Sequence, residues 1–298
     1  MRIRQSDLNA AQRCFQQKHL IDQQVQETGI RGQTNSMTVF GTVVHFAVQI
    51  LEQLHHEQRP DALDVALSTF DYYWHPDNVR QLQPQGIDVW LPRSNWGALH
   101  KRGRKAITDY YPMLKADQGL LLALEYTWNA PITIDGQRHE LTGTVDRLAI
   151  RHASDGPYLS VEDFKTGKKP TYTRQLVQWT MYSYASTQPA FWEGFGELIE
   201  PVVKKLHTQN RALFNDGTGL SVIKRRGRWI NMGQGSTVSI HDVGWRDEGD
   251  YARLKVQLRE YVNAHTHQVF PLNLTGEVCL YCPFSRNGAC GGVPISET

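Results

Sequence analysis

The chain has 298 residues, 40% of them hydrophobic, with 32 Lys and Arg against 30 Asp and Glu. This hydrophobic fraction suffices for a folded core of one large or two small domains, and the net charge of +2 excludes a histone-like polycation. No segment approaches the roughly 18 consecutive apolar residues of a membrane-spanning helix, and the N-terminus lacks the apolar region of a secretory signal. We therefore expect a soluble, cytoplasmic protein without a membrane segment, in a reducing compartment.

The first 120 residues have the apolar periodicity of helices. Residues 6–27, 40–56, 61–75 and 97–115 are each predicted to form one helix. The helix over 40–56 has apolar side chains at helical spacing, namely Val44, Ala47, Val48, Leu51 and Leu54. The N-terminal part of the chain is therefore expected to be mainly helical.

From Leu120 onward the pattern becomes that of strands. Three segments, 121–134, 139–151 and 157–167, alternate apolar and polar residues and are separated by turns that contain Asp-Gly. They predict three successive antiparallel strands. A helix over 173–186, a hairpin formed by 220–232 and 236–243, and a helix over 247–265 are expected to follow. The pattern favours an α/β core with a helical N-terminal elaboration.

Two carboxylates and a lysine lie on the second and third predicted strands. Because residues i and i+2 share one face of a strand, Asp163 and Lys165 project to the same side and Phe164 to the other. Antiparallel pairing through the turn at 154–157 brings Asp146 to the same spot. Two carboxylates suit Mg²⁺ or Mn²⁺, and the lysine can help deprotonate an attacking water or neutralise charge on a phosphate. A bare D-x-K tripeptide is also typical of a simple salt bridge beside a turn.

The surrounding motifs resemble those of the RecB-type branch of the PD-(D/E)XK nucleases. The strings GTVDR at 143–147, VEDFKTGK at 161–168 and QWTMY at 178–182 resemble the G-x-x-D-R strand, the D-x-K-T-G strand and the Q-x-x-x-Y helix of that branch, in the same order. Upstream, GTVVH at 41–45 resembles its G-x-x-x-H helix, and Glu125 stands where the first core strand often carries an acidic residue. The resemblance runs over residues 6–290 and implies the restriction-endonuclease-like core with a mixed sheet.

The resemblance also implies roles for individual residues. The implied metal ligands are His45, Asp146, Asp163, the carbonyl of Phe164 and, on the first strand, Glu125. Lys165 would be the catalytic lysine. Gln178 and Tyr182, four apart on one helical face, would hold a phosphate or orient that lysine. As alternatives, His45 is a helix-surface histidine and Tyr182 a core aromatic at helical spacing.

The four cysteines are too few for a disulfide scaffold, and three of them crowd the C-terminus. Cys279, Cys282 and Cys290 offer three soft ligands in one short segment, and Cys14 is the only remaining cysteine. Four thiolates suit a tetrahedral zinc site or an iron-sulfur cluster, and buried structural thiols are the third possibility.

The cysteine pattern resembles the iron-sulfur subgroup of RecB-type nucleases. That subgroup includes the AddB nuclease domain, the CRISPR-associated RecB-like exonucleases and eukaryotic exonuclease V, in which four cysteines hold a 4Fe-4S cluster that joins the two ends of the domain. Pro283 after Cys282 fits the subgroup, whereas Phe15 stands where many relatives have proline after the first cysteine. The implied organisation is a single nuclease domain over 1–298, with a helical part at 1–119, a catalytic core at 120–270 and a Cys-rich loop at 271–298 joined to Cys14.

The function expected from the resemblance is metal-dependent hydrolysis of phosphodiester bonds in DNA. A stand-alone exonuclease on single-stranded DNA, running 5′ to 3′, is favoured because no G-x-x-x-x-G-K-[ST] phosphate loop of a helicase is present. Recombination, repair or DNA-end processing would be its setting, with recombination or CRISPR-adaptation proteins as partners and oligomers left open. The alternatives are a non-catalytic DNA-binding or adaptor protein and a zinc-stapled RNA-processing nuclease.

Candidate DNA contacts are two basic runs and several aromatic residues. The runs are at 100–105 and 224–228, and each is alternatively a solvated face. The candidate base-stacking residues are Trp90, Trp96, Tyr110 and Trp229.

Overall fold

The computed structural model describes residues 1–28, 33–34, 36–75, 77–82, 88–89, 95–154, 156–167, 176–193, 224–232, 238–244, 246–271, 284 and 290. Its N-terminal elements, in chain order, are β1 (Arg2–Arg4), α1 (Gln5–Arg13), α2 (Phe15–Thr28), β2 (Gln33–Thr34), α3 (Ser36–His56), α4 (Ala62–Tyr73), the 3₁₀ helix η1 (Val79–Leu82), β3 (Asp88–Val89) and α5 (Trp96–Ala116). The later elements are β4 (Leu120–Ile134), β5 (Gln137–Ala153), β6 (Gly156–Lys165), α6 (Leu176–Ala185), α7 (Pro189–Glu193), β7 (Lys224–Asn231), β8 (Ser239–Gly244) and α9 (Glu248–His267).

The prediction of one helix over residues 6–27 is wrong, because the chain breaks at Cys14 into α1 and α2. Cys14 is extended, with φ −164° and ψ 116°, and its N–H still donates to the carbonyl of Ala10 at 3.2 Å. Its Sγ then accepts from the N–H of Gln17 at 3.4 Å, and its carbonyl accepts from Lys18. Cys14 thus ends one helix and caps the next, a role for which polar helical sequence on both sides gives no local signal.

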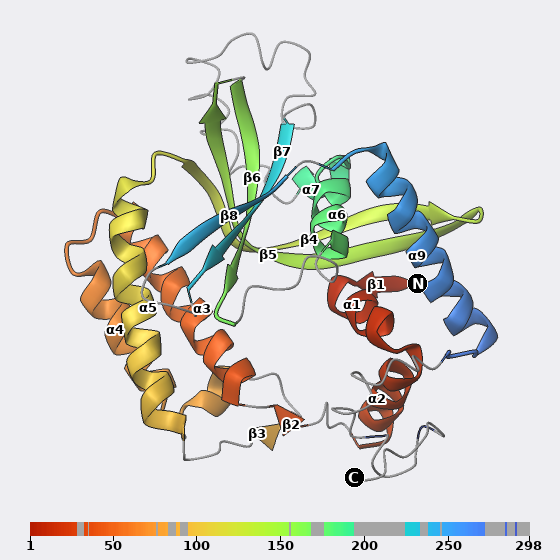
Figure 1. The fold of residues 1–298 in the computed structure, drawn as a ribbon, viewed down its shortest axis with the longest axis horizontal. Helices are drawn as coiled ribbons and strands as arrows, with labels where there is room; N and C mark the ends of the chain where they lie inside the picture. The colour runs from red at the N-terminus through yellow and green to blue at the C-terminus, as the bar shows by residue number, and fades with distance from the viewer. Residues whose placement is uncertain are drawn as a thin grey trace, which may run out of the picture.

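A six-stranded mixed sheet forms the centre of the molecule (Figure 1). β4 pairs antiparallel with β5, and β5 pairs antiparallel with β6, as the three successive strands predict. β7 lies parallel to β6, and β8 returns antiparallel to β7 as the predicted hairpin. β1, which the periodicity misses because it has three residues, runs parallel to β5. The predicted α/β class with a mixed sheet and a helical N-terminal part is therefore confirmed.

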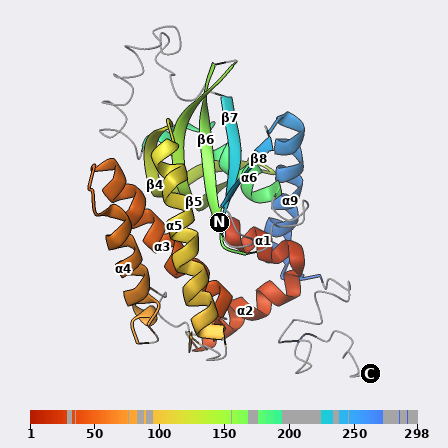
Figure 2. The ribbon, with the colours of Figure 1, turned by 60° about the vertical axis from the view of Figure 1, so that its left-hand side comes forward.

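Helices cover the strands from two sides (Figures 1 and 2). Buried apolar side chains form a separate hydrophobic core on each side. The first, the sheet core, joins β4–β7 to α1, α6 and α9 through buried side chains such as Leu8, Tyr182 and Leu258. The second, the helical core, gathers α3, α4 and α5 and includes Phe164 of β6 and Ile230 of β7. Since neighbouring residues of β6 and β7 contribute to different cores, these strands connect the two halves of the molecule.

Among the described residues, α3 alone is long and apolar enough to meet the length and composition criteria of a membrane span. The window Met37–His56 has mean hydropathy 1.3, and 44% of it is buried inside the protein. Its buried side chains pack against α4 and α5, as those of a core helix do. This is weak evidence for a span, and no membrane protein is indicated.

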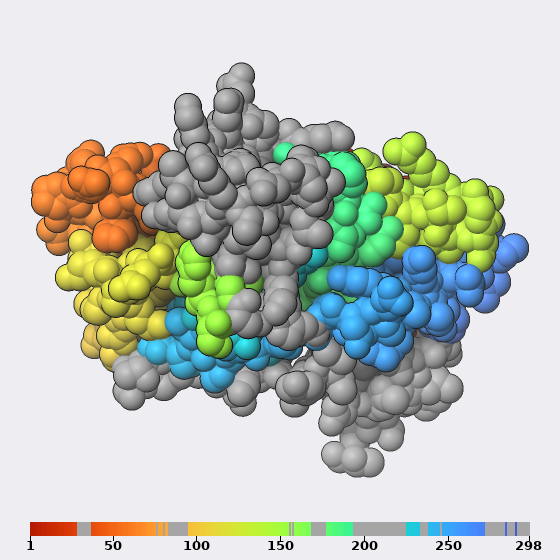
Figure 3. All heavy atoms as spheres, turned by 90° about the horizontal axis from the view of Figure 1, so that it is seen from above, coloured from red at the N-terminus to blue at the C-terminus, as the bar shows by residue number. Residues whose placement is uncertain are grey.

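In the space-filling view, α4 and the turn between β4 and β5 lie at opposite ends of the molecule (Figure 3).

Candidate active site

The two central strands bring two aspartates and a lysine together. Arg147 of β5 pairs with Glu162 of β6, and Asp146 and Asp163 are the neighbouring residues on the two strands. Asp146 Oδ2 accepts a hydrogen bond from the backbone N–H of Phe164 at 2.6 Å. Asp163 makes an ion pair with Lys165, two residues along the same strand. The two carboxylates and the amine therefore share one face, as strand alternation requires.

His45 of α3 and Glu125 of β4 complete a group of possible metal ligands with Asp146. One ligand atom from each of these three residues lies within 4.8 Å of the others, and His45 Nδ1 lies 3.5 Å from Asp146 Oδ2. Glu125 adopts a left-handed backbone conformation with φ 48°, a strained state for a non-glycine residue that is typical of functional sites. An imidazole and two carboxylates suit Mn²⁺ or Mg²⁺.

α3 approaches the end of β6 closely at a glycine. A Cβ on Gly41 would lie 3.1 Å from the hydroxyl of Thr166, just after Lys165. The ring of His45 meets Phe164 edge to face, with centroids 5.9 Å apart. Gly41 and His45 lie one helical turn apart on α3. Gly41 allows the close contact with Thr166, and His45 directs its ring to Phe164.

Gln178 and Tyr182 on α6 reach the same site from above the sheet. Gln178 Nε2 donates to Asp163 Oδ1 at 2.7 Å and lies 2.8 Å from the Tyr182 hydroxyl, which donates to the carbonyl of Thr144 at 2.7 Å. Tyr182 is also 2% exposed and belongs to the sheet core, so the alternative of a core aromatic describes it too. In this structure the pair orients Asp163; a contact with Lys165 or a phosphate stays a prediction.

A cleft of about 660 Å³ opens over these residues. One wall consists of His45, Asp146, Asp163, Lys165, Gln178 and Tyr182, together with Thr144. The other is the polar face of α1, with Gln5, Ser6, Asn9, Ala10, Gln12 and Arg13. Sequence reasoning missed α1, although the signal was present: Leu8 and Ala11 are buried against the sheet, which leaves an almost uncharged polar face opposite them.

The two carboxylates of the ligand group, Glu125 and Asp146, both have raised pKa values. Burial raises the pKa of Glu125 to about 7, with further contributions from Asp146 and Asp163. Burial likewise raises the pKa of Asp146 to about 6, although the nearby His45 opposes the shift. A bound divalent cation would remove this repulsion, so the donor set fits a metal ion both chemically and electrostatically.

Most residues of the two basic runs contact other residues of the protein. On α5, Arg104 and His100 contact Asp71, Lys105 pairs with Asp109, and Arg102 donates to the carbonyl of Thr166. On β7, Arg228 contacts Glu162 at 3.2 Å and Arg226 lies 3.8 Å from Asp242. Except for Asp109, which lies one helical turn from Lys105, these counter-charges lie on other elements than the runs themselves, so the runs look like open basic patches in the sequence.

The predicted stacking residues are largely part of the core. Tyr110 is 3% and Trp229 is 7% exposed, so the prediction that they stack with DNA bases is wrong for this conformation. Trp96 stacks on Trp74 with centroids 3.9 Å apart. Trp90 lies outside the described residues.

Two of the four cysteines can be placed. Cys14 is buried at the junction of α1 and α2, and Cys290 is partly buried. Cys279 and Cys282 lie outside the described residues, so the four-cysteine site stays a prediction.

Comparison with known proteins assigns this chain to a family. The family model of the PD-(D/E)XK nuclease superfamily matches residues 5–287. No curated protein matches the chain. A similar solved structure, described as the crystal structure of SSO0001, has 12% sequence identity over 91% of this chain and 92% of the other, with a TM-score of 0.34. On the family match, which covers most of its length, this chain belongs to the PD-(D/E)XK nuclease superfamily.

Proposed function

We propose that the protein is a Mg²⁺- or Mn²⁺-dependent deoxyribonuclease that degrades single-stranded DNA from an end. Membership of the superfamily indicates metal-dependent hydrolysis of phosphodiester bonds in nucleic acid. The observation that carries the proposal is the convergence of a possible ligand group, His45, Glu125 and Asp146, with the Asp163–Lys165 pair; of these residues, all but Glu125 line one cleft. DNA, single strands and the 5′ to 3′ direction rest on the resemblance of the motifs to the RecB-type branch.

The residues of the cleft divide the chemical work. His45, Glu125 and Asp146 would hold the metal, joined by Asp163 and the carbonyl of Phe164 as the resemblance implies. When bound, the metal supplies Lewis-acid polarisation of a phosphoryl oxygen and lowers the pKa of a coordinated water. Gln178 holds the carboxylate of Asp163 in place.

Lys165 acts in this proposal as a cation. Burial lowers the pKa of Lys165, but the carboxylates of Asp163 and Asp146 outweigh it and raise the pKa above its ordinary value. The amine is therefore protonated at neutral pH. Of the two roles that the sequence leaves open, neutralising negative charge on the phosphate in the transition state is favoured over accepting a proton from water.

The test is digestion of end-labelled DNA by the purified protein with Mn²⁺, with Mg²⁺ and with EDTA. We expect metal-dependent degradation of linear single strands from the labelled 5′ end, with circular single strands and linear duplexes resistant. Equal cleavage of circular strands would contradict an exonuclease. Preference for RNA of the same sequence would favour the RNA-processing alternative, and inactivity at every metal concentration would favour the non-catalytic one.

We further propose that the chain is one nuclease domain, with a helical part at 1–119, a core at 120–270 and a Cys-rich loop at 271–298. β1 lies in the same sheet as the catalytic strands, and α3–α5 pack on Phe164 and Ile230, which supports a single unit. The cytoplasmic location and the recombination or CRISPR-adaptation partners also remain proposals.

A 4Fe-4S cluster held by Cys14, Cys279, Cys282 and Cys290 is proposed to join the two ends of this domain. In support, the helix that follows Cys14 packs on the C-terminal end of α9 (Figure 1). The ring centroids of Phe15 and Tyr261 lie 6.4 Å apart, and His19 stacks on Phe270 with ring centroids 3.8 Å apart. Cys14 therefore lies on the same side of the molecule as Phe270, near the end of the described segment that precedes Cys279 in sequence.

Anaerobically purified protein is expected to be brown, with broad visible absorbance, and Cys14→Ala is expected to lose that absorbance. The variant should be destabilised by on the order of 5 kcal/mol, because it opens a loop that spans most of the chain. Stability is expected to suffer more than turnover, since Cys14 is not one of the cleft-lining residues. Visible spectra and denaturant unfolding check both points. A colourless, zinc-loaded protein would instead support the zinc alternative, and unchanged stability would refute the joining role.

A further inference from the structure

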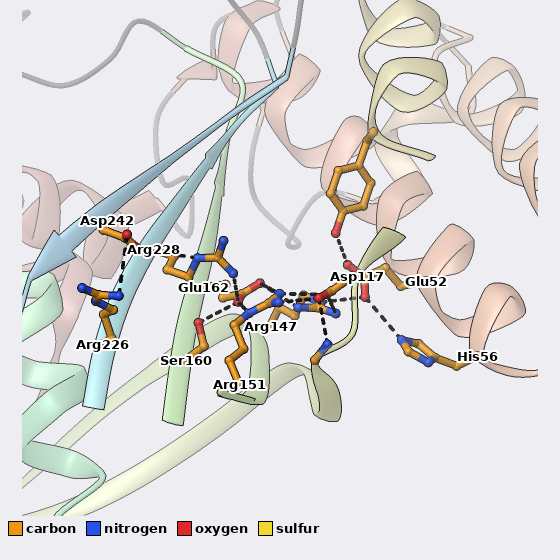
Figure 4. A network of polar contacts seen from close by, with 12 residues as sticks. Glu52, His56, Asp117, Arg147, Arg151, Ser160, Glu162, Arg226, Arg228 and Asp242 are labelled. Carbon is orange, nitrogen blue, oxygen red and sulfur yellow. Dashed lines mark hydrogen bonds and ion pairs between the residues drawn. The ribbon is translucent and has the colours of Figure 1, made fainter. Parts of the chain in front are cut away.

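Arg147, next to Asp146 on β5, is the centre of a buried network of charges (Figure 4). Its guanidinium donates from Nε to Glu52 at 2.7 Å, from Nη1 to Glu162 at 2.7 Å and from Nη2 to Asp117 at 2.8 Å. Each of its three nitrogens therefore meets a carboxylate from a different part of the chain: α3, β6 and the segment after α5.

The central members of the network, Glu52, Arg147 and Glu162, are enclosed, and Glu162 accepts from several donors. Glu52 and Glu162 are both 0% exposed, and Arg147 is 1% exposed. Glu162 also accepts from Ser160 at 2.7 Å and Arg151 at 2.6 Å. Replacing buried ion pairs by apolar side chains is often neutral or stabilising, so stability alone is a poor account of such a cluster.

Three members of the network lie on the same helix or strands as residues of the proposed metal site. Arg147 directly follows Asp146, and Glu162 directly precedes Asp163. Since neighbours on a strand point to opposite faces, the network lies behind the two aspartates. Glu52 lies seven residues, about two turns, after His45 on α3. Glu52, Arg147 and Glu162 therefore join the three elements that carry His45, Asp146 and Asp163.

α3, which carries His45, packs in a different hydrophobic core from β5, which carries Asp146. His45 belongs to a helix of the helical core, whereas β5 and its Asp146 belong to the sheet core. The 3.5 Å separation of His45 from Asp146 must therefore be fixed across the junction of two separately packed halves. Glu52 and Arg147 bridge that junction with a buried, directional ion pair.

We infer that Glu52, Arg147 and Glu162 form a positioning triad that sets the geometry, and hence the affinity, of the metal site from behind the sheet. The inference rests on the proposed metal-dependent function. Residues that orient metal ligands from outside commonly change metal affinity 10–100-fold when replaced. Asp117 binds the same guanidinium but belongs to a segment without a site residue, so it provides a matched control.

The test is calorimetric titration of Mn²⁺ into wild type, Glu52→Gln, Asp117→Asn and Asp146→Asn, with thermal unfolding of each protein in parallel. Glu52→Gln is expected to bind Mn²⁺ about tenfold more weakly. Asp117→Asn is expected to keep the wild-type affinity within about twofold even where its melting temperature falls, because no site residue moves with it. Arg147→Lys keeps the charge but cannot reach both glutamates, and it should also bind about tenfold more weakly. If Glu52→Gln does not fold, Arg147→Lys serves as the test variant in its place.

Two results would overturn the positioning role while leaving the proposed function intact. One is wild-type Mn²⁺ affinity in folded Glu52→Gln or Arg147→Lys, and the other is an equal loss of affinity in Asp117→Asn. By contrast, wild-type protein that binds no Mn²⁺, or binding that survives Asp146→Asn, would contradict the metal site itself and the inference with it.

Discussion

Lys165→Ala is expected to lower kcat on single-stranded DNA by about 10²–10³-fold, the usual cost of removing one preorganised electrostatic contact. The reason is the geometry of Lys165, which lies in the cleft beside Asp163 and is kept protonated by two neighbouring carboxylates. In the proposed mechanism, its loss removes the positive charge that neutralises the reacting phosphate. Single-turnover rates with saturating Mn²⁺ measure the effect, and Mn²⁺ titration checks that the metal still binds.

The matched control is Lys255→Ala, which removes the same charge from an exposed position on α9. The rate of this variant should differ from wild type by less than about twofold, since the screened field of one distant surface charge is weak. A Lys165→Ala protein as active as the control would show that the chemistry occurs elsewhere.

Glu162 is expected to make the fold sensitive to acid. Burial raises the pKa of Glu162, but Arg147 and Arg151 more than offset it and bring the pKa to about 2, below its ordinary value of 4.5. Because the folded-state pKa is the lower one, Glu162 stabilises the protein fully above pH 4.5, and this stability is lost as pH falls towards about 2. The shift corresponds to about 3 kcal/mol.

Glu162→Gln is expected to cost about 3–5 kcal/mol at neutral pH, because it leaves three arginines short of a buried counter-charge. It should also flatten the decline of stability between about pH 5 and 3. Urea unfolding across this range measures both effects. Asp135→Asn breaks the half-exposed pair with Arg259 and should cost less than about 1 kcal/mol. An unchanged pH slope in Glu162→Gln would refute the assignment of the acid sensitivity to this residue.

The sequence was sufficient where local rules decide the structure. Strand alternation and the Asp-Gly turns predict β4, β5 and β6, and with them the shared face of Asp146, Asp163 and Lys165. The helical spacing of Gln178 and Tyr182 predicts that both meet the same site. These features depend on residues close together in the chain.

Other features depend on partners far away in sequence and could not be predicted. Glu52 and Arg147 are 95 residues apart, and nothing near either residue indicates their contact. From the sequence alone Arg228 is a candidate DNA contact, because its counter-charge, Glu162, lies 66 residues earlier and gives no local signal. The left-handed conformation of Glu125 likewise has no local signal in the sequence.

The attachment of α1 has a consequence for the affinity of the cleft for its substrate. β1, directly before α1, pairs with β5; Leu8 and Ala11 anchor the middle of the helix; and Cys14 fixes its end. A wall held at both ends and in the middle is ordered before any substrate arrives. The conformational entropy of this wall is therefore lost during folding and not during binding, so a nucleic acid strand would meet a preorganised surface.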